Sequence, residues 1–294
     1  MLRELKTFVA VARHGTFAAA GQRVGLTQSA VSAAVNALET RHGARLFDRV
    51  GRGLALNAAG TAFLPEARAV LARAEAAERL LDELAGLKRG SVRLFASQTI
   101  AAYWLPPRMA AFAQSHPGIE LRLSIGNTHQ VVEAVLAGEA ELGLIEGAED
   151  APRLERTRIA ADRLIVVAAP GHPLADRERM LGATELKALD WALREAGSGT
   201  RSEFEAALPR GMAASDLKTA LVLPSNEAIL TAVAASAGDG GGLVTATSEL
   251  AARPLIEAGR LVRLPLELPE RPFYRLRHRE RGASRAAEAF AAAL

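Results

Sequence analysis

The first 57 residues divide into short helical segments separated by glycines, and this spacing constrains the fold more than any other feature of the sequence. Apolar residues recur at helical spacing over Leu2–Ala12 and stop before a glycine. Thr16 is placed to cap a short helix over 17–24, and Thr27 to cap a longer helix over 28–42. Two helices joined by a turn that contains glycine form a helix-turn-helix, so the sequence predicts that motif here.

The third helical segment has two faces of different character. An apolar stripe marks the side that packs on a core, and it consists of Val31, Ala34, Val35 and Leu38. The opposite face holds small and hydrogen-bonding side chains, where a plain surface helix usually carries Lys and Glu. Such a face can enter the major groove of DNA, where Gln and Asn pair bidentately with adenine. We therefore predict DNA contacts by Thr27, Gln28, Ser29, Ser32 and Asn36.

The formal net charge of +3 is distributed unevenly along the chain. Residues 1–57 hold eight basic and three acidic residues, a net charge of +5, whereas 58–89 is neutral and the remainder carries −2. Either this asymmetry is accidental, or the first segment alone binds a polyanion. The stretch ARLFDRVGRGLALNAAG favours a polyanion, because it predicts two strands around an arginine-containing turn. Arg49 and Arg52 would contact DNA phosphate there.

Residues 58 to about 87 predict one long helix with a regular apolar seam. The seam residues follow at alternating steps of four and three, and they are Phe63, Ala67, Val70, Ala74, Ala77, Leu81 and Leu84. This alanine-rich heptad pattern favours close packing against a second helix. The alternative is an amphipathic helix that lies on its own domain.

Beyond residue 90 strands alternate with helices, which predicts an α/β fold with mostly parallel sheets. In such sheets, ligands bind beyond the carboxyl ends of the strands. Three hydroxyl-containing segments follow strands and open helices: Ser97–Ile100, Asn127–Gln130 and Arg194–Arg201. Hydroxyls and free amides at helix N-termini favour a small anion, although ordinary capping explains any single one of them.

Several classes of site find no support in the sequence. The chain has no Cys and its six His show no metal-ligand spacing, so we predict neither a metal nor a cofactor. It lacks a GxSxG elbow, a P-loop and an obvious pair of catalytic carboxylates, so we do not predict an enzyme. No apolar run is long enough to span a membrane and the N-terminus has no signal-peptide core, so we expect a cytoplasmic protein. A DNA-binding protein with a purely structural role remains an alternative, and so does a catalytic site within the α/β fold, because fold alone does not fix function.

The quoted segments resemble the LysR-type transcriptional regulators. LTQSAVS and LETRHGARLFDR look like blocks of their winged helix-turn-helix. SQTIAAYWLP, GNTHQVVEAVLAGEAELGLIEG and REAGSGTR look like blocks that line their effector cleft. The chain also departs from the family pattern, since such regulators often carry Arg or another long polar residue at the position of Ala33 and a basic residue at that of Asn36.

The resemblance implies three parts and a self-assembly. They are a DNA-binding domain over 1–57, a linker helix over 58–89 that dimerises, and an effector-binding domain over 90–294 similar to periplasmic binding proteins. Subdomain I of the last would span about 90–161 plus 267–294, and subdomain II about 162–266. Dimers would join into a tetramer through contacts between their effector-binding domains.

The resemblance also implies where an effector binds. Contacts would come from Ser97, Gln98, Thr99, Ile100, Thr128, Ser198, Gly199 and Thr200, with Glu146 and Asn226 as further wall residues. The SQTIA and GSGTR blocks resemble those of regulators of inorganic-sulfur or carbon-fixation metabolism, which suggests sulfate, sulfite or a small carboxylate. We expect a regulator whose binding or bending of double-stranded promoter DNA responds to such an anion.

Overall fold

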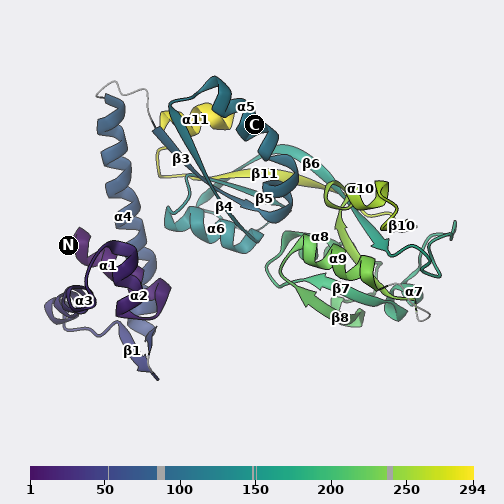
Figure 1. Cartoon of the computed structure of the whole chain (residues 1–294), viewed down its shortest axis with the longest axis horizontal. Coiled ribbons are helices and arrows are strands. Elements are labelled where there is room, and N and C mark those ends of the chain that lie inside the picture. The colour runs from purple at the N-terminus through teal and green to yellow at the C-terminus, as the bar shows by residue number, and fades with distance from the viewer. Residues whose placement is uncertain (52, 85–89, 148, 150, 237–240) are drawn as a thin grey trace. The chain divides into compact units, whose positions relative to one another are not determined.

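The computed structural model describes the chain except residues 52, 85–89, 148, 150 and 237–240 (Figure 1). The chain forms two compact units. The N-terminal unit is built mainly from residues 1–88, and the C-terminal unit from residues 89–136 and 140–294. We describe each unit separately, because each has its own core.

The N-terminal unit begins with the predicted helix-turn-helix. Its elements are α1 (Leu2–His14), α2 (Phe17–Val24), α3 (Gln28–His42), β1 (Phe47–Val50), β2 (Gly53–Leu56) and α4 (Ala58–Leu84). The predicted caps are confirmed, since the hydroxyl of Thr16 accepts from the amide of Ala19 and that of Thr27 from the amide of Ala30, both at 3.2 Å. Gly25 ends α2 with φ 68°, a left-handed conformation that costs glycine little.

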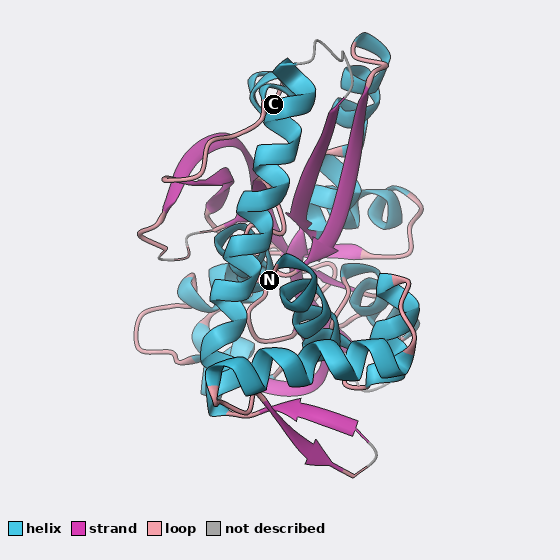
Figure 2. Cartoon of the chain, turned by 90° about the vertical axis from the view of Figure 1, so that its left-hand side faces the viewer, coloured by secondary structure: helices cyan, strands magenta, loops and turns pink. Residues whose placement is uncertain are grey.

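An aromatic cluster holds the helices of this unit together. Phe8 is fully buried, and its ring centroid lies 5.4 Å from that of Phe47 and 5.2 Å from that of Phe63. The predicted apolar stripe of α3 faces this core, with Val31, Val35 and Leu38 buried and Ala34 partly buried. The hairpin of β1 and β2 projects from the helices (Figure 2).

The long helix α4 divides its apolar seam between two environments. Phe63 and the fully buried Ala67 pack into the core of the N-terminal unit. Further along, Val70 is 46% exposed and Leu81 is 67% exposed. The seam therefore begins inside its own domain and is exposed further along, at Val70 and Leu81. The side chain of Leu84 lies outside the described residues.

The C-terminal unit contains a sheet whose strand order is β4-β3-β5-β11-β6-β9-β7-β8, with β10 paired to β6. The strands are β3 (Gly90–Ser97), β4 (Ile119–Gly126), β5 (Leu142–Glu146), β6 (Leu154–Ala168), β7 (Asp190–Arg194), β8 (Lys218–Leu223), β9 (Leu243–Ser248), β10 (Val262–Leu264) and β11 (Glu270–His278). The helices are α5 (Pro106–Ser115), α6 (Thr128–Ala137), α7 (Ala183–Ala188), α8 (Gly199–Ala206), α9 (Asn226–Ala235), α10 (Glu249–Glu257) and α11 (Arg285–Ala292), with a π-helix η1 (Ile100–Trp104) and a 3-10 turn η2 (Ala214–Asp216).

The two long strands β6 and β11 join two lobes, and Figure 1 shows them side by side. Lobe I contains β3–β5, α5, α6 and α11, with a core around Leu94, Phe273 and Phe290. Lobe II contains β7–β10 and α7–α10, with a core around Trp191 and Phe204. The expected mostly parallel pairing is found within β3–β5 and within β7–β9, but not elsewhere. The connecting strands pair antiparallel, because β11 returns along the path that β6 took.

Candidate functional site

The outward face of α3 carries the residues predicted to contact DNA. Gln28, Ser29 and Asn36 are exposed, and Ser32 is partly exposed. The Thr27 hydroxyl is occupied by its cap and lies 3.0 Å from the Ser29 hydroxyl. The N-terminal end of α3 is thus fixed by local hydrogen bonds while its other polar groups face outward.

A groove of about 730 Å³ lies between α3 and the β-hairpin. On the helix side it is lined by Ser32, Asn36 and Thr40, and on the hairpin side by Arg45 and Arg49, among others. Both arginines are exposed. Arg52 lies outside the described residues, so the prediction for it remains a prediction.

The far end of α3 is tied to α1 by an ion pair. The guanidinium of Arg41 donates to both carboxylate oxygens of Glu4 at 2.8 Å. Those hydrogen bonds lower the pKa of Glu4 from its usual value. Arg41 therefore serves the orientation of α3 in the folded unit.

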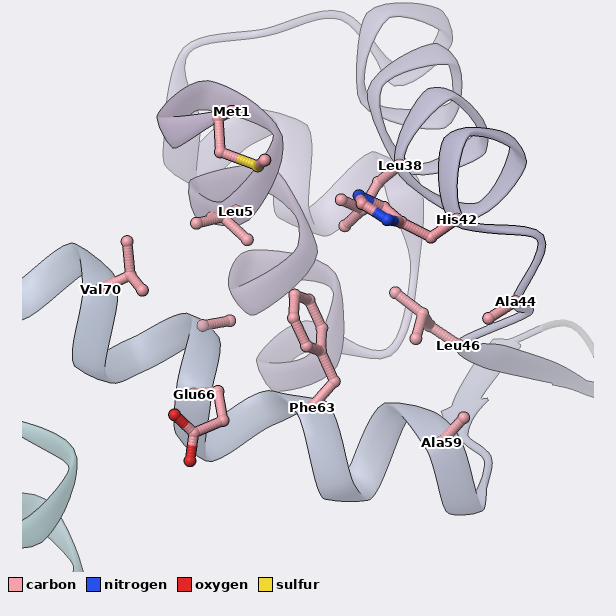
Figure 3. Close-up of a pocket in the computed structure, with 11 residues that line it drawn as sticks. Met1, Leu5, Leu38, His42, Ala44, Leu46, Ala59, Phe63, Glu66 and Val70 are labelled. Carbon is pink, nitrogen blue, oxygen red and sulfur yellow. The ribbon is translucent and has the colours of Figure 1, made fainter.

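A second groove, of about 520 Å³ and mostly apolar, lies between α1, the end of α3 and α4. Figure 3 shows Leu5 and Leu38 on one side of it and Phe63 and Val70 on the other. The groove includes Val70, so it is continuous with the exposed part of the α4 seam.

In the C-terminal unit, the polar residues predicted to bind an effector come together where the two lobes meet. Lobe I contributes Ser97, Thr99, Thr128 and Glu146, and lobe II contributes Ser198, Thr200 and Asn226. Each of these side chains is at most 5% exposed. We call this set, together with Asp162 and Arg271, the buried polar cluster. Of the other predicted residues, Gln98 is partly exposed and Gly199 is buried, while Ile100 packs in the core of lobe I.

The hydroxyl groups of the cluster are not helix caps. Thr99 precedes η1 and Ser198 precedes α8, yet neither side chain caps its helix. At α6 the amide of Gln130 is capped by Asn127, which leaves the neighbouring Thr128 free for other contacts. Ordinary capping therefore does not explain these three hydroxyls.

The carboxylate of Glu146 is the acceptor for hydroxyls from both lobes. Ser97 of lobe I donates to Oε2, and Thr200 of lobe II lies 3.5 Å from Oε1. The hydroxyl of Thr128 donates to the main-chain oxygen of Glu146 at 3.4 Å. A Cβ atom on Gly199 would lie 2.6 Å from that same oxygen, so only glycine lets α8 approach this closely.

Arg271 is the cation of the cluster, and sequence reasoning missed it. Its Nη2 donates to Asp162 Oδ2 at 2.8 Å, and its Nη1 donates to the Thr200 hydroxyl at 2.9 Å. Nη1 also lies 3.6 Å from Glu146 Oε1, and Nη2 donates to the Thr99 hydroxyl at 3.4 Å. Asp162 and Arg271 are aligned partners on β6 and β11. No local motif marks either residue, and only the pairing of two distant strands could have found them.

A second buried guanidinium, that of Arg194 in lobe II, holds two side chains that contact lobe I. Arg194 donates to both oxygens of Glu195 and, through Nη1, to Asn226 Oδ1 at 2.7 Å. Asn226 in turn donates to the Thr99 hydroxyl at 3.1 Å, and Asn127 donates to Glu195 Oε1 at 3.3 Å. Burial acts to raise the pKa of Glu195, but the hydrogen bonds and charge of Arg194, together with the other hydrogen bonds that Glu195 accepts, outweigh it, and the pKa lies below its usual value.

Further contacts join η1 to the start of α9. The Tyr103 hydroxyl donates to Glu227 Oε1 at 3.0 Å, and the amide of Asn226 donates to Gln98 Oε1 at 3.1 Å. Burial, and then the neighbouring Glu227 carboxylate, raise the pKa of Tyr103 to about 12. Polar contacts between the lobes thus continue beyond the cluster, from Asn226 to Glu227.

Comparison with known proteins accounts for both units. The family described as "Bacterial regulatory helix-turn-helix protein, lysR family" matches residues 2–61, and the "LysR substrate binding domain" matches residues 85–294. The chain belongs to the LysR family. It is a DNA-binding transcriptional regulator with an effector-binding domain, and the prediction that it is not an enzyme is confirmed.

Curated relatives and a solved structure agree with this membership. The HTH-type transcriptional regulator YeiE of Escherichia coli K12 is 35% identical over 98% of this chain and 95% of its own length. A RuBisCO operon transcriptional regulator of Allochromatium vinosum is 33% identical over 98% of this chain and 93% of its own. Full-length CbnR in complex with its target DNA has the same fold, with a TM-score of 0.64, 22% identity and coverage of 100% of this chain and 98% of that one.

Neither a metal site nor a membrane-spanning helix is found in the described part of the chain. No group of three His, Asp or Glu residues there could hold a metal ion. Among the described helices, none has the length and apolar character needed to cross a membrane.

Proposed function

We propose that this LysR-family regulator senses a small oxyanion at the buried polar cluster and that its DNA binding or bending responds to that anion. The observation that carries the proposal is the convergence of Ser97 and Thr200, one from each lobe, on a single carboxylate beside Arg271. Hydroxyl donors and a guanidinium are the groups that bind oxyanions in proteins. Sulfate, sulfite and small carboxylates carry the matching acceptors.

Glu146 occupies the position that such an anion would take. Its carboxylate accepts from the same donors and is shared between lobes. With Asp162 also beside Arg271, the cluster holds two carboxylates and one guanidinium, so an added anion meets repulsion while Glu146 stays in place. Effector binding therefore requires the Glu146 carboxylate to give up its hydroxyl partners to the ligand.

That exchange reaches both lobes. The Thr99 hydroxyl accepts from Asn226 of lobe II and from Arg271 of the connecting strand β11. A ligand that takes over Ser97 and Thr200 changes the contacts that hold the lobes together, and a difference in affinity between two lobe arrangements is what couples a ligand to a distant event. The distant event in this family is DNA binding by the N-terminal unit.

The test is calorimetric titration of the full-length protein with sulfate, sulfite and acetate, paired with footprinting on its own upstream intergenic DNA. We expect one of these anions to bind and to alter the footprint. The double variant Ser97→Ala/Thr200→Ala should lose anion binding and keep DNA binding, whereas Ser115→Ala, an exposed hydroxyl on lobe I, should keep both. If no anion binds or the double variant binds normally, the proposal fails, and a structural DNA-binding role without an effector gains support.

Self-association through α4 is the second part of the proposal. The exposed apolar face of α4, with Val70 and Leu81, continues from the apolar groove in Figure 3, so the same helix of a second copy supplies a complementary surface. Contacts between effector-binding domains of two such dimers complete a tetramer, and the assembly acts on promoter DNA in the cytoplasm.

Sedimentation analysis tests the assembly. Leu81→Glu places a charge on the exposed seam and should lower the association state, whereas Val50→Glu, at an equally exposed position on the hairpin, should not. An unchanged mass for Leu81→Glu would remove α4 from the interface.

A further inference from the structure

The outward face of α3, which carries the residues predicted to contact DNA, has an unusual chemical composition. From Gln28 to Ala37 the sequence contains no Arg, Lys, Asp or Glu. The outward side chains of this stretch are amides, hydroxyls and the methyl groups of Ala33 and Ala37, which are both exposed. Glu39, the first acidic residue along the helix, accepts from the amide of Leu46 and so faces the hairpin.

The major groove presents a different chemical target for each base. Guanine offers two acceptors that Arg or Lys binds, and cytosine offers a donor that Asp or Glu accepts. Adenine offers one acceptor and one donor, which match the amides of Gln28 and Asn36. Thymine offers a methyl group, which favours an apolar contact. The face of α3 therefore holds none of the charged groups that bind guanine or cytosine most specifically. Its amides match adenine and its methyl groups match thymine, while its hydroxyls can bind any base.

Position along the helix singles out Ala33. Gln28 and Asn36 are eight residues apart, a rise of about 12 Å along the helix axis, which corresponds to about three or four base pairs. Ala33 lies between them, and it shares an outward face with Ser29 and Asn36 at helical spacing. Ala37 lies one turn further from the N-terminal end, which enters the groove first in a helix-turn-helix.

We propose that α3 reads a run of A·T pairs, in which the methyl group of Ala33 packs against a thymine methyl and the amides of Gln28 and Asn36 bind flanking adenines. The groove between α3 and the hairpin receives the adjoining sugar-phosphate strand, with Arg45 and Arg49 facing it. Specificity thus rests on thymine methyls and adenine edges, and the arginines add affinity alone.

The experiment begins with duplexes selected from a random-sequence pool by the full-length protein. Each thymine of the selected site is then replaced by uracil, which removes only the methyl group. We expect binding to weaken about fourfold at the thymine that contacts Ala33. The same replacement should have no effect on the variant Ala33→Gly. The matched control Ala37→Gly makes the same change on the same helix, and it should keep the uracil effect.

Two further results decide the proposal even if Ala33→Gly weakens the helix. The variant Ala33→Arg should select sites in which a G·C pair replaces an A·T pair, because its guanidinium acquires a guanine partner. Conversely, wild-type sites with a required guanine under α3, or sites indifferent to uracil at every thymine, would overturn the assignment. So would a uracil effect that survives in Ala33→Gly.

Discussion

On α3, Gln28 and Asn36 face solvent, whereas Ser97, Thr200 and Arg271 in the C-terminal unit are each at most 1% exposed and bonded to one another or to Glu146. The polar side chains of α3 can thus contact a partner directly, whereas those of the buried polar cluster already have hydrogen-bond partners within the protein. A rigid, highly charged duplex can meet an exposed face and displace only water and counterions. A small ligand can enter the buried polar cluster only by replacing the protein's own hydrogen bonds, since an unpaired buried polar group is costly.

The largest expected effect comes from removing the cation of the buried polar cluster. Arg271→Met leaves Asp162 and Glu146 buried without their cation, which should destabilise the C-terminal unit by about 3–5 kcal/mol. Urea unfolding of the full chain, followed by the fluorescence of Trp104 and Trp191, measures the change.

The matched control lies on the same strand. Arg277→Met removes an ion pair with Glu155 that is about 40% exposed, so it should cost less than about 1 kcal/mol. Equal losses for the two variants would contradict the view that burial makes the Arg271 contacts important.

The Glu146 carboxylate competes with an anionic ligand inside the buried polar cluster, so removing its charge tests the same difference through ligand binding. Glu146→Gln keeps an acceptor for Ser97 but removes the charge that an incoming anion must face. We expect affinity for the effector anion to rise about tenfold, the factor that corresponds to about 1.4 kcal/mol of relieved repulsion. Calorimetric titration with sulfite measures it. Glu120→Gln, on an exposed edge strand, should leave the affinity unchanged, and weaker binding by Glu146→Gln would instead make its charge part of the ligand site.

The difference between the helix-turn-helix and the buried polar cluster also explains which residues could be predicted from the sequence. Local signals located the helix-turn-helix, because capping at Thr16 and Thr27 and apolar spacing on α3 are properties of short segments. The hydroxyls of the buried polar cluster were located by strand and helix starts and by family resemblance. Asp162 and Arg271 were missed, since their ion pair forms only where β6 and β11 pair, and the two residues are more than one hundred positions apart in the sequence. The antiparallel pairing of these strands was missed for the same reason.

For the exposed DNA-binding face, the contribution of charge to affinity can be measured through the salt dependence of binding. Arg49→Ala should weaken binding to all DNA sequences alike and flatten the dependence of log K on log salt by about one unit, because one phosphate contact is lost. Arg52→Ala should behave in the same way. Fluorescence anisotropy at several salt concentrations measures the slope. Arg23, exposed on α2, provides the control, and a slope that Arg49→Ala leaves unchanged would mean that Arg49 does not reach phosphate.

The smallest effect concerns the orientation of α3. Hydrogen bonds from Arg41 lower the pKa of Glu4 in the folded protein, so this pair contributes stability that is fully present above the unfolded-state pKa of Glu4. That contribution is lost as the pH falls through the lower, folded-state pKa. Arg41→Gln should therefore lower the urea midpoint of the N-terminal unit slightly at pH 7. The difference from wild type should disappear in acid, once Glu4 is protonated in both proteins. A difference that persisted after Glu4 is protonated would assign the effect to packing of the Arg41 side chain instead of its charge. The N-terminal unit would then depend, like the buried polar cluster, on contacts that solvent and salt do not screen.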